Sequence, residues 1–423
     1  MPHFTDFVYW FRQAMPYINQ HKGKTFILHL DADIEDAVLT EILQDIALLK
    51  SLNIHLVIIF ADPLTQGAYQ PVNQQKLAEL QTLMIQRYHQ LCAGITTYHG
   101  NTEENLSICQ GNWIIAKPEG VIQGLDYLHK GVIRHIKTKV ITSLLQQGHV
   151  LFFNSICYSQ TGKIYHVNSL DIAASLANQL KANKLIFLSN LVIRNNEAEM
   201  IREINEPRLE YWLQQHPQQP EITRLLHTAY QTYAQTERIH IINSQQKHSL
   251  LMELFSRDGI GTLISRTNFE TINTADINDI NRIIELIHPL EQRGVMRQRS
   301  REKLEHEIGY FLVMKRDNYV IGCVAIYPII EQHTAELACL VIDPEYHCQG
   351  RGSRLLAKAE NMAIKQGINT LYLLTTHTYE WFSERGFYPT DPEQLPAGTY
   401  YNQTRKSKVL HKQLQAQAGQ HTQ

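Results

Sequence analysis

The chain has 423 residues, of which 43% are hydrophobic and 19% charged, and its formal net charge is -2. This length exceeds one ordinary hydrophobic core and predicts two domains. The near-neutral charge gives no reason to expect nucleic acid as a partner, and no apolar run approaches the ~18 residues needed to span a bilayer. Six cysteines without a C-x-x-C pair favour reduced thiols in the cytoplasm over a disulfide framework or a zinc site, so we expect no metal.

Strands alternate with helices over residues 1–265, which predicts a doubly wound, mostly parallel α/β sheet. An aromatic-striped helix over Phe7–Ile18 opens this domain, and we expect its stripe to pack on its own domain, with a neighbouring subunit as the alternative. Strands are predicted at Thr25–Leu30, His55–Phe60, Trp113–Lys117, His149–Phe153, Lys184–Leu188 and Arg238–Asn243. Helices are predicted at Ala37–Leu52, Gln74–Cys92, Leu170–Ala182, Glu221–Gln235 and Ser249–Arg257.

The pattern changes to an α+β domain over residues 266–414, followed by a polar, frayed tail at 415–423. A helix is expected to start near Thr274, before a hairpin of Tyr310–Lys315 with Tyr319–Tyr327. A third strand, Glu336–Ile342, leads to a turn with two glycines, Gly350 and Gly352, and an amphipathic helix. The last predicted elements are the strand Thr370–Thr376 and the short helix Thr378–Arg385.

The turn with two glycines is the stretch with the clearest chemistry. The N-terminus of a helix presents backbone N–H groups and a positive dipole end, which together suit a phosphate. Gly350 and Gly352 allow a ligand to approach the backbone closely, and Arg351 adds a positive charge. The alternative is a strand-to-helix turn whose glycines serve geometry alone.

Asp343-Pro-Glu-Tyr, then Gln349-Gly-Arg-Gly352, then Trp381-Phe-Ser-Glu-Arg-Gly-Phe387 resembles the GNAT acetyltransferase family. The family's Q/R-x-x-G-x-G/A signature is met at both glycines and departs at its first position, where His347 stands. The resemblance implies that the backbone N–H groups of Gln349, Gly350, Arg351 and Gly352 hold the pyrophosphate of acetyl-CoA. It also implies that the strand around Cys339, Leu340 and Val341 pairs with the pantetheine arm.

Over its whole length the chain is similar to the bacterial N-acetylglutamate synthase family. The similarity is carried by segments such as Gly111-Asn-Trp-Ile-Ile-Ala-Lys-Pro118, Glu253-Leu-Phe-Ser-Arg-Asp-Gly-Ile-Gly-Thr262 and Arg405-Lys-Ser-Lys-Val-Leu410. That family joins an amino-acid-kinase-like domain, which senses arginine, to a GNAT domain that makes N-acetylglutamate. The resemblance also implies a homo-oligomer that assembles through the kinase-like domain.

Acetyl transfer requires a base because an α-amine is mostly protonated at neutral pH. The resemblance makes Glu336 the base, and the alternative is a surface carboxylate at the end of a strand. Thr375 matches the family's Ser/Thr position for protonating the CoA thiolate, with Tyr372 and Tyr379 as rivals.

The two carboxylates of glutamate suit arginine, which binds a carboxylate through its guanidinium fork. The resemblance makes Arg405, Ser407, Arg299 and Arg301 the substrate-binding residues. The family segment usually reads Arg-Arg-Ser-Arg, and here its first arginine is replaced by Gln298. The alternative for each arginine is an ordinary solvated charge.

The first domain departs from the amino-acid kinase pattern. Where kinases carry a lysine and two glycines after the first strand, this chain has His29-Leu-Asp-Ala32, and the second strand leads into Ala61-Asp-Pro63. Asp31 and Asp62 would repel phosphate, so we predict a catalytically degenerate domain. These departures leave open whether it still senses arginine. Gly259-Ile-Gly-Thr262 lacks the third glycine of a G-x-G-x-x-G motif, so we do not predict a nucleotide site there.

The sequence therefore predicts an amino-acid N-acetyltransferase that uses acetyl-CoA on L-glutamate, the first step of arginine biosynthesis. Two alternatives remain open. One is a GNAT enzyme acting on another amino acid or amine. The other is a regulatory amino-acid-binding protein with weak acetyltransferase activity.

Overall fold

The computed structural model describes residues 4–66, 70–98, 107–195, 198–205, 209–210, 212–213, 220–256, 259–265, 270–316, 319–347, 350–396 and 407–414. The chain divides into two compact units, Met1–Thr267 and Asn268–Gln423. The predicted tail at 415–423 lies outside the described residues. Among the helices of the described ranges, none is both long and apolar enough to cross a membrane.

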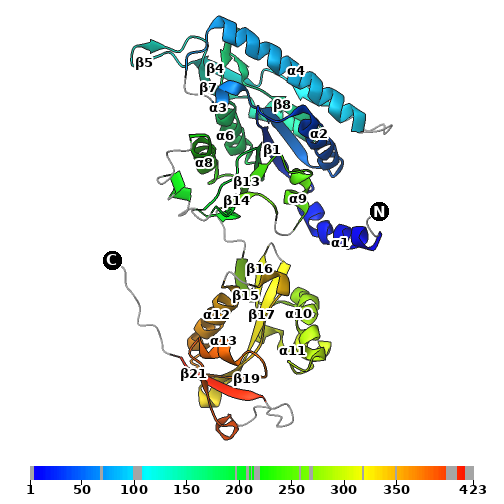
Figure 1. Cartoon of the computed structure of the whole chain (residues 1–423), viewed down its shortest axis with the longest axis vertical. Coiled ribbons are helices and arrows are strands. Elements are labelled where there is room, and N and C mark those ends of the chain that lie inside the picture. Colours follow the sequence, from blue (N-terminus) through cyan, green and yellow to red (C-terminus); the bar gives the residue numbers. More distant parts are fainter. Residues whose placement is uncertain are drawn as a thin grey trace. The chain divides into compact units, whose positions relative to one another are not determined.

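The first unit is built on an eight-stranded sheet with the order β12-β14-β13-β11-β1-β2-β8-β3 (Figure 1). All neighbouring pairs are parallel except β13 with β14, so the prediction of a mostly parallel sheet is confirmed. The strands are β1 (Thr25–Leu30), β2 (His55–Phe60), β3 (Ile108–Gln110), β8 (Val150–Phe153), β11 (Lys184–Ser189), β12 (Glu203–Ile204), β13 (Arg238–Asn243) and β14 (Thr262–Ser265).

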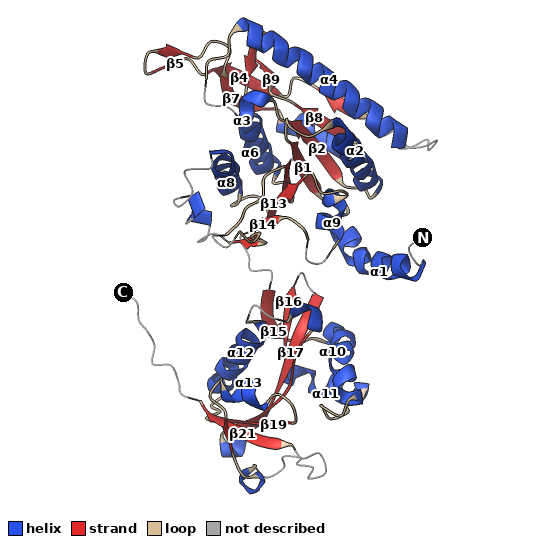
Figure 2. Ribbon diagram, in the orientation of Figure 1, coloured by secondary structure: helices blue, strands red, loops and turns tan. Residues whose placement is uncertain are grey.

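Helices cover both faces of this sheet because its central strands are apolar on both sides (Figure 2). In β1, Ile27 packs into one core while Phe26 and Leu28 pack into the other, as the alternation of side chains along a strand requires. The first core contains side chains from α5 (Thr138–Gln146), α6 (Ser169–Leu180) and α8 (Pro220–Thr232). The second contains side chains from α1 (Phe4–His21), α2 (Asp36–Ser51), α4 (Gln74–Tyr98) and α9 (Ser249–Phe255).

A smaller four-stranded sheet, with the order β10-β9-β4-β7, is the part of this unit that the sequence did not predict. The strand expected at Trp113–Lys117 belongs to it and not to the main sheet, because β4 pairs with β7 and β9. Its strands are β4 (Ile114–Pro118), β7 (Gly131–Ile136), β9 (Ile156–Tyr158) and β10 (Ile164–His166). The short hairpin β5 (Val121–Ile122) and β6 (Leu125–Asp126) and the one-turn helix α3 (Pro63–Gln66) complete the unit.

The aromatic stripe of α1 does not pack on its own domain as expected. Phe7, Trp10 and Phe11 are 56%, 47% and 45% exposed, whereas Ala14 is buried in the core below α2 and α4. Only the second half of the helix is therefore anchored to the unit. The hydrophobic pattern predicted the helix correctly but did not distinguish a buried face from an exposed one.

The second unit is built on a seven-stranded sheet with the order β15-β16-β17-β18-β19-β21-β20. The strands are β15 (Glu270–Thr274), β16 (Phe311–Arg316), β17 (Tyr319–Ile329), β18 (Thr334–Ile342), β19 (Thr370–Thr375), β20 (Tyr388–Pro389) and β21 (Lys408–Gln413). Neighbouring strands are antiparallel except β18 and β19. The predicted hairpin is β16 with β17.

Helices also cover both faces of the second sheet (Figure 2). One core contains side chains from α12 (Arg351–Lys365) and α13 (Tyr379–Ser383), and the other from α10 (Ile280–Gln292) and α11 (Arg301–Glu307). Short 3₁₀ turns lie at η1 (Ile277–Asp279), η2 (Ile308–Tyr310), η3 (Ile330–Gln332), η4 (Pro344–Tyr346) and η5 (Pro392–Gln394). The helix expected near Thr274 begins slightly later, because Asp276 forms a capping box with Asp279.

Candidate active site

The second sheet opens between its two parallel strands. β18 and β19 pair over only three residues, from Thr334 with Thr370 to Glu336 with Tyr372. Beyond Glu336 the two strands have no ladder of hydrogen bonds between them, so the backbone groups of β18 on that edge are available to a ligand. Glu336 stands at the point where the opening begins.

A β-bulge at Cys339 shapes this opening. The φ of Cys339 is +53°, and the pairing register between β17 and β18 shifts at this position. Leu337 packs in the core under α12, whereas Cys339 and Val341 pack in the core with α10, so the extra residue reverses the alternation of side chains. A bulge also bends the strand that carries it, which contributes to the separation of β18 from β19.

A cavity of about 290 Å³ lies between the ends of β18 and β19 and the segment that precedes α11. Six of the predicted site residues line it: Arg299, Glu336, Cys339, Leu340, Thr375 and Ser407. The structure thus brings the predicted base, the predicted acid and part of the predicted substrate-binding set into one cavity.

A second cavity, of about 350 Å³, continues the first toward the turn with two glycines. The two cavities share Leu340, Thr378 and Phe382 in their walls, and the second is also lined by Arg351 and Gly352. The two cavities therefore adjoin, and the channel named below is this pair, which extends from the N-terminus of α12 to Glu336. An elongated ligand with a phosphate at one end and a reactive group at the other matches this shape.

The N-terminus of α12 has the geometry that phosphate binding requires. Gly350 is the N-cap residue with φ +69°, a conformation that favours glycine, and the first N–H groups of a helix have no intrahelical acceptor. At Gly352 a Cβ would lie 3.1 Å from the Trp381 ring, so only glycine fits without displacing that ring. Gln349 lies outside the described residues.

The Arg351 side chain is engaged within the domain. Its Nε donates to Glu270 at 2.6 Å and its Nη1 to the Tyr346 carbonyl at 3.2 Å, and the residue is only 6% exposed. The contribution of Arg351 to a phosphate is therefore assigned to its backbone N–H and not to its guanidinium.

Glu336 is half-buried and surrounded by charged and polar groups. Tyr327 pairs with it across β17 and β18, which places both side chains on one face of the sheet. Burial raises the pKa of Glu336 above its ordinary value of 4.5, while Arg299, Arg297 and Lys303 act in the opposite direction. A carboxylate with a raised pKa is a better proton acceptor for an ammonium group.

Thr375 has a neighbour that orients its hydroxyl. The Thr375 oxygen accepts a hydrogen bond from the Thr378 backbone N–H at 3.0 Å and lies 2.8 Å from the Thr378 hydroxyl. When the Thr378 hydroxyl donates as well, the Thr375 proton is left for a ligand in the cavity. Among its rivals, Tyr379 packs under the Lys408 ammonium group, and neither Tyr372 nor Tyr379 lines the two cavities described here.

Arg301 and Val341 do not line the two cavities, and the position of Arg405 is not described. Arg301 does not line the cavity, because its Nε donates to Glu305 at 2.9 Å and its Nη1 to Asn281 at 3.0 Å. Val341 packs in the core with α10, so it offers a ligand only its backbone. Arg405 lies outside the described residues.

Sequence reasoning missed Arg297, Lys303, Glu307, Tyr327 and Thr378, all of which line the first cavity. The Lys303–Glu307 spacing of four residues on a helix was a signal that the two side chains interact. The position of Tyr327 opposite Glu336 depends on the register of two strands, and no single segment of sequence reveals it.

In the first unit, Asp62, which follows β2, has a buried partner. Asp62 is fully buried, and its Oδ2 lies 3.0 Å from His166 Nε2. His29 lies 2.9 Å from the Ser169 hydroxyl, at the end of β1 where kinases carry their lysine and glycines. The residues at the ends of β1 and β2 are thus held by buried polar contacts within this unit.

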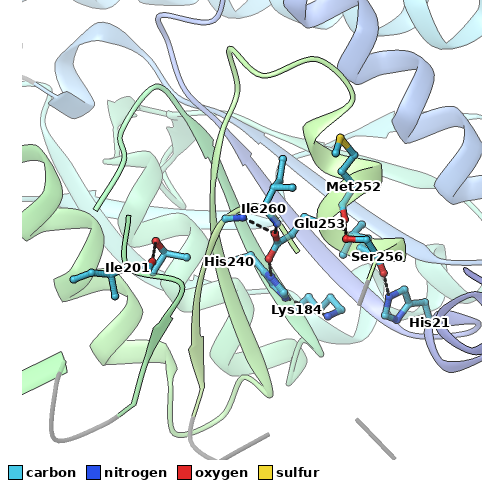
Figure 3. A network of polar contacts seen from close by, with 11 residues as sticks. His21, Lys184, Ile201, His240, Met252, Glu253, Ser256 and Ile260 are labelled. Carbon is cyan, nitrogen blue, oxygen red and sulfur yellow. Dashed lines mark hydrogen bonds and ion pairs between the residues drawn. The ribbon is translucent and has the colours of Figure 1, made fainter. Parts of the chain in front are cut away.

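A buried polar network lies under α9 in the first unit (Figure 3). His240 Nδ1 lies 2.6 Å from Glu253 Oε1, and Lys184 Nζ lies 3.1 Å from His240 Nε2. Because an ammonium group only donates, His240 Nε2 accepts and Nδ1–H donates to Glu253. Burial lowers the pKa of His240 to about 4, which agrees with a neutral imidazole.

The glycines of Gly259-Ile-Gly-Thr262 serve this network. The Ile260 and Gly261 N–H groups donate to Glu253 Oε2 at 2.6 and 2.7 Å, and a Cβ at Gly259 would lie 2.6 Å from the same oxygen. Burial alone would raise the pKa of Glu253, but the hydrogen bonds it accepts hold the pKa at about 2. The two glycines are therefore needed because the buried Glu253 carboxylate lies against their backbone.

These observations define the class of protein: a GNAT acetyltransferase domain joined to an amino-acid-kinase-like domain. The acetyltransferase (GNAT) family model matches residues 277–388, and the amino acid kinase family model matches residues 25–243. Amino-acid acetyltransferases from Pectobacterium atrosepticum and Salmonella typhi are 37% and 38% identical to this chain, over 96% of the chain and 98% of each relative. The chain belongs to the amino-acid acetyltransferase family and is an acetyltransferase enzyme.

Two solved structures resemble the whole chain. One is N-acetylglutamate synthase from Neisseria gonorrhoeae complexed with coenzyme A and L-arginine, which is 30% identical, has a TM-score of 0.82 and covers 97% of this chain and 100% of its own. The other is the same enzyme complexed with coenzyme A and N-acetyl-glutamate, at 31% identity and the same coverage, with a TM-score of 0.58.

Proposed function

We propose that this protein transfers the acetyl group of acetyl-CoA to the α-amine of L-glutamate, giving N-acetyl-L-glutamate and CoA. The observation that carries the proposal is the pair of adjoining cavities that extends from the N-terminus of α12 to Glu336. The resemblance to N-acetylglutamate synthase supports glutamate as the substrate and arginine biosynthesis as the pathway.

The proposed reaction uses the two ends of the channel differently. The N–H groups of Gly350, Arg351 and Gly352 hold the pyrophosphate, and the free edge of β18 at Cys339 and Leu340 receives the pantetheine arm. This arrangement directs the thioester toward the cavity that Glu336 lines. Fixing both reactants in this way accounts for much of the rate enhancement expected of such an enzyme.

Glu336 accepts one proton from the substrate ammonium group, directly or through a water molecule. The free amine then attacks the thioester carbonyl, and the tetrahedral intermediate collapses as the C–S bond breaks. Thr375 donates its hydroxyl proton to the departing thiolate and recovers a proton from the nitrogen of the intermediate, directly or through water, which leaves the neutral amide. The proton held by Glu336 returns to solvent. Arg299 and Ser407 in the cavity wall, together with Arg405, are assigned to the carboxylates of the substrate.

The test is the release of CoA by the purified protein with a panel of amino acids and amines, each with and without L-arginine. We expect release with L-glutamate well above the rate with any other amine. A different preferred amine would replace glutamate in the proposal, and no release with any amine would favour a regulatory amino-acid-binding protein. The assays with added L-arginine determine whether the first unit still senses arginine.

We also propose that the protein forms a homo-oligomer through the first unit. Phe7, Trp10 and Phe11 on α1 expose an aromatic surface of the kind that subunit interfaces cover. Light scattering of the full-length protein measures its mass directly. A monomer at micromolar concentration would exclude this part of the proposal.

A further inference from the structure

The channel of the second unit has a cofactor end and a substrate end. The cavity at the N-terminus of α12 is lined by Gly352 and Trp381, and it meets the other cavity at Leu340, Thr378 and Phe382. The first cavity extends from this junction to Glu336 and the segment before α11. An acyl acceptor must approach the thioester from the side opposite the phosphate-binding turn, so its carboxylates lie at this far end.

The far end is lined by an unusual number of charged side chains from one short segment. Arg297, Arg299 and Lys303 all reach it, and the anionic residues there are Glu307 and Glu336. Among the described residues that line this end, three cations and two carboxylates leave a net charge of +1. An amino acid with a carboxylate side chain has a net charge of -1 and is complementary to it.

Arg297 lies in the segment that precedes α11 and lines the cavity. Its neighbour Gln298 is exposed and does not line it. The Arg297 carbonyl also accepts a hydrogen bond from Arg299 Nη1 at 2.9 Å, which connects the two arginines locally. The positive charges of Arg297 and Arg299 therefore act at the same end of the cavity, where both oppose the rise in the pKa of Glu336 that burial causes.

Lys303 is held at the same wall by its own helix. Its Nζ lies 3.6 Å from Glu307 Oε1, and Glu307 Oε2 accepts a hydrogen bond from the Tyr327 hydroxyl at 2.9 Å. Burial raises the pKa of Tyr327, so this hydroxyl stays protonated and keeps donating. Lys303 is 42% exposed and carries three donor hydrogens, so one ion pair leaves it capacity for a ligand.

We propose that Arg297 and Lys303 form a carboxylate-binding subsite that selects amino acids with an acidic side chain. This inference rests on the proposed acetyl transfer and adds two specificity-determining residues to Arg299, Arg405 and Ser407. Both residues bind the substrate and take no part in proton transfer. Their loss therefore weakens the binding of a dicarboxylic substrate while the cofactor end is unaffected.

The experiment compares L-glutamate with L-glutamine, its neutral isostere, in initial rates of CoA release at saturating acetyl-CoA. Arg297→Gln and Lys303→Gln are each expected to raise the KM for glutamate about tenfold or more, the loss typical of one charge-assisted hydrogen bond. The KM for acetyl-CoA is expected to stay within about twofold. The double variant is expected to lose most of the preference for glutamate over glutamine.

Two sets of controls separate a binding role from a general effect of charge. Arg293→Gln removes the same charge at the C-terminus of α10, where the residue is exposed and does not line the cavity, and it is expected to leave the KM for glutamate unchanged. Arg297→Lys and Lys303→Arg keep the charge and are expected to retain most of the affinity.

An unchanged KM for glutamate in both glutamine variants would overturn the subsite. An equal rise in Arg293→Gln would also overturn it, because the effect would then be a long-range field. The activity of the wild-type protein shows whether only the subsite is wrong or the proposed function as well. Wild-type turnover of a neutral amino acid in preference to glutamate overturns the function itself, whereas glutamate-dependent turnover with unaffected variants overturns only the subsite.

Discussion

At the scale of single residues, the reactive groups are positioned by backbone geometry more than by their immediate sequence. Glu336 is the last residue of β18 that pairs with β19, so its carboxylate lies where these two parallel strands begin to separate. Thr375 is the last residue of β19, and the turn that follows brings Thr378 back to its hydroxyl. Each proposed role thus belongs to a residue held on a strand beside the cavity, where its side chain has a rigid support.

Replacing Glu336 with glutamine tests its role as the base. We expect kcat to fall about 100-fold or more, because general base catalysis commonly contributes that much, while the KM for acetyl-CoA changes little. In the wild type, kcat/KM should decrease as the pH falls through the pKa of Glu336, which burial raises above 4.5. This acidic limb should be absent in Glu336→Gln.

The exposed Glu331 provides the matched control for that substitution. Glu331→Gln is expected to leave both kcat and the pH profile unchanged. Equal losses of kcat and of acetyl-CoA affinity in Glu336→Gln would assign the base to another group.

Asp45 predicts a pH dependence of stability. It is 5% exposed on α2, and burial raises its pKa from 3.8 to about 6. The folded state thus binds the proton more tightly than the unfolded state, so the buried charge reduces stability above about pH 6 and this penalty is relieved as the pH falls toward 4. We expect Asp45→Asn to raise the free energy of unfolding at pH 8 by on the order of 2 kcal/mol.

The gain from Asp45→Asn should shrink between pH 6 and pH 4, which denaturant titrations at several pH values measure. Asp33→Asn, at an exposed position, is the control and should change stability little at any pH. A gain that is independent of pH would contradict the electrostatic explanation.

At the scale of elements, the N-terminus of α12 packs against the Trp381 ring of α13. Trp381 lies under the Arg385 guanidinium at 3.9 Å and contacts Phe382 edge to face at 4.9 Å, so the ring has little freedom to move. Gly352 lies so close to this ring that a Cβ at its position would be 3.1 Å from it. The turn to which we assign phosphate binding therefore depends on packing between two helices as well as on its own backbone.

Gly352→Ala tests this dependence. The added methyl group would lie 3.1 Å from Trp381, so the helix or the ring must shift. We expect the KM for acetyl-CoA to rise about tenfold, with stability reduced by about 1 kcal/mol, as is usual for overpacking. The KM for glutamate should change little, and steady-state kinetics with each substrate varied separates the two effects.

Gly309→Ala is the matched control, because a Cβ there meets nothing within 4 Å. It is expected to leave both KM values unchanged. An unchanged KM for acetyl-CoA in Gly352→Ala would show that the turn tolerates the methyl group and that the close approach is not required for binding.

At the scale of the whole molecule, each unit has hydrophobic cores of its own. The buried clusters of the first unit contain residues up to Ile264, and those of the second begin at Ala275. The first unit also carries the buried Lys184–His240–Glu253 network, whose hydrogen bonds connect α9 to β11 and β13. Separate cores predict separate cooperative unfolding transitions.

Glu253→Gln should lower only the transition of the first unit. An amide has one acceptor oxygen in place of two, so it can accept either from the Ile260 and Gly261 N–H groups or from His240 Nδ1–H, and the buried donor left unpaired costs about 3 kcal/mol. Calorimetry of the full-length protein should show one transition lowered by about 5–10 °C and the other unchanged. The exposed Glu35, changed to glutamine, is the control, and equal shifts of both transitions would contradict independent units.

The fold was predicted well from sequence where one periodic signal dominates. The bounds of β1, β2 and β13 agree with the apolar runs that predicted them, because strands buried on both faces must be continuously apolar. The four-stranded sheet was missed, since its strands are short and half-exposed and their polarity does not mark them. The exposed face of α1 was misjudged because hydrophobic periodicity does not reveal which surface covers it.

The sequence alone determined the family and the turn at Gly350 and Gly352, and it predicted Glu336 as the base, because local motifs carry these features. Tertiary structure decided which charges share the cavity: it includes Arg299 and excludes Arg301, and it adds Arg297, Lys303 and Tyr327. The tertiary structure also pairs the Arg351 guanidinium with Glu270, which is 81 positions away in the chain. The physical reason is that a side chain's partners depend on strand register and on packing between distant elements, which no local pattern specifies.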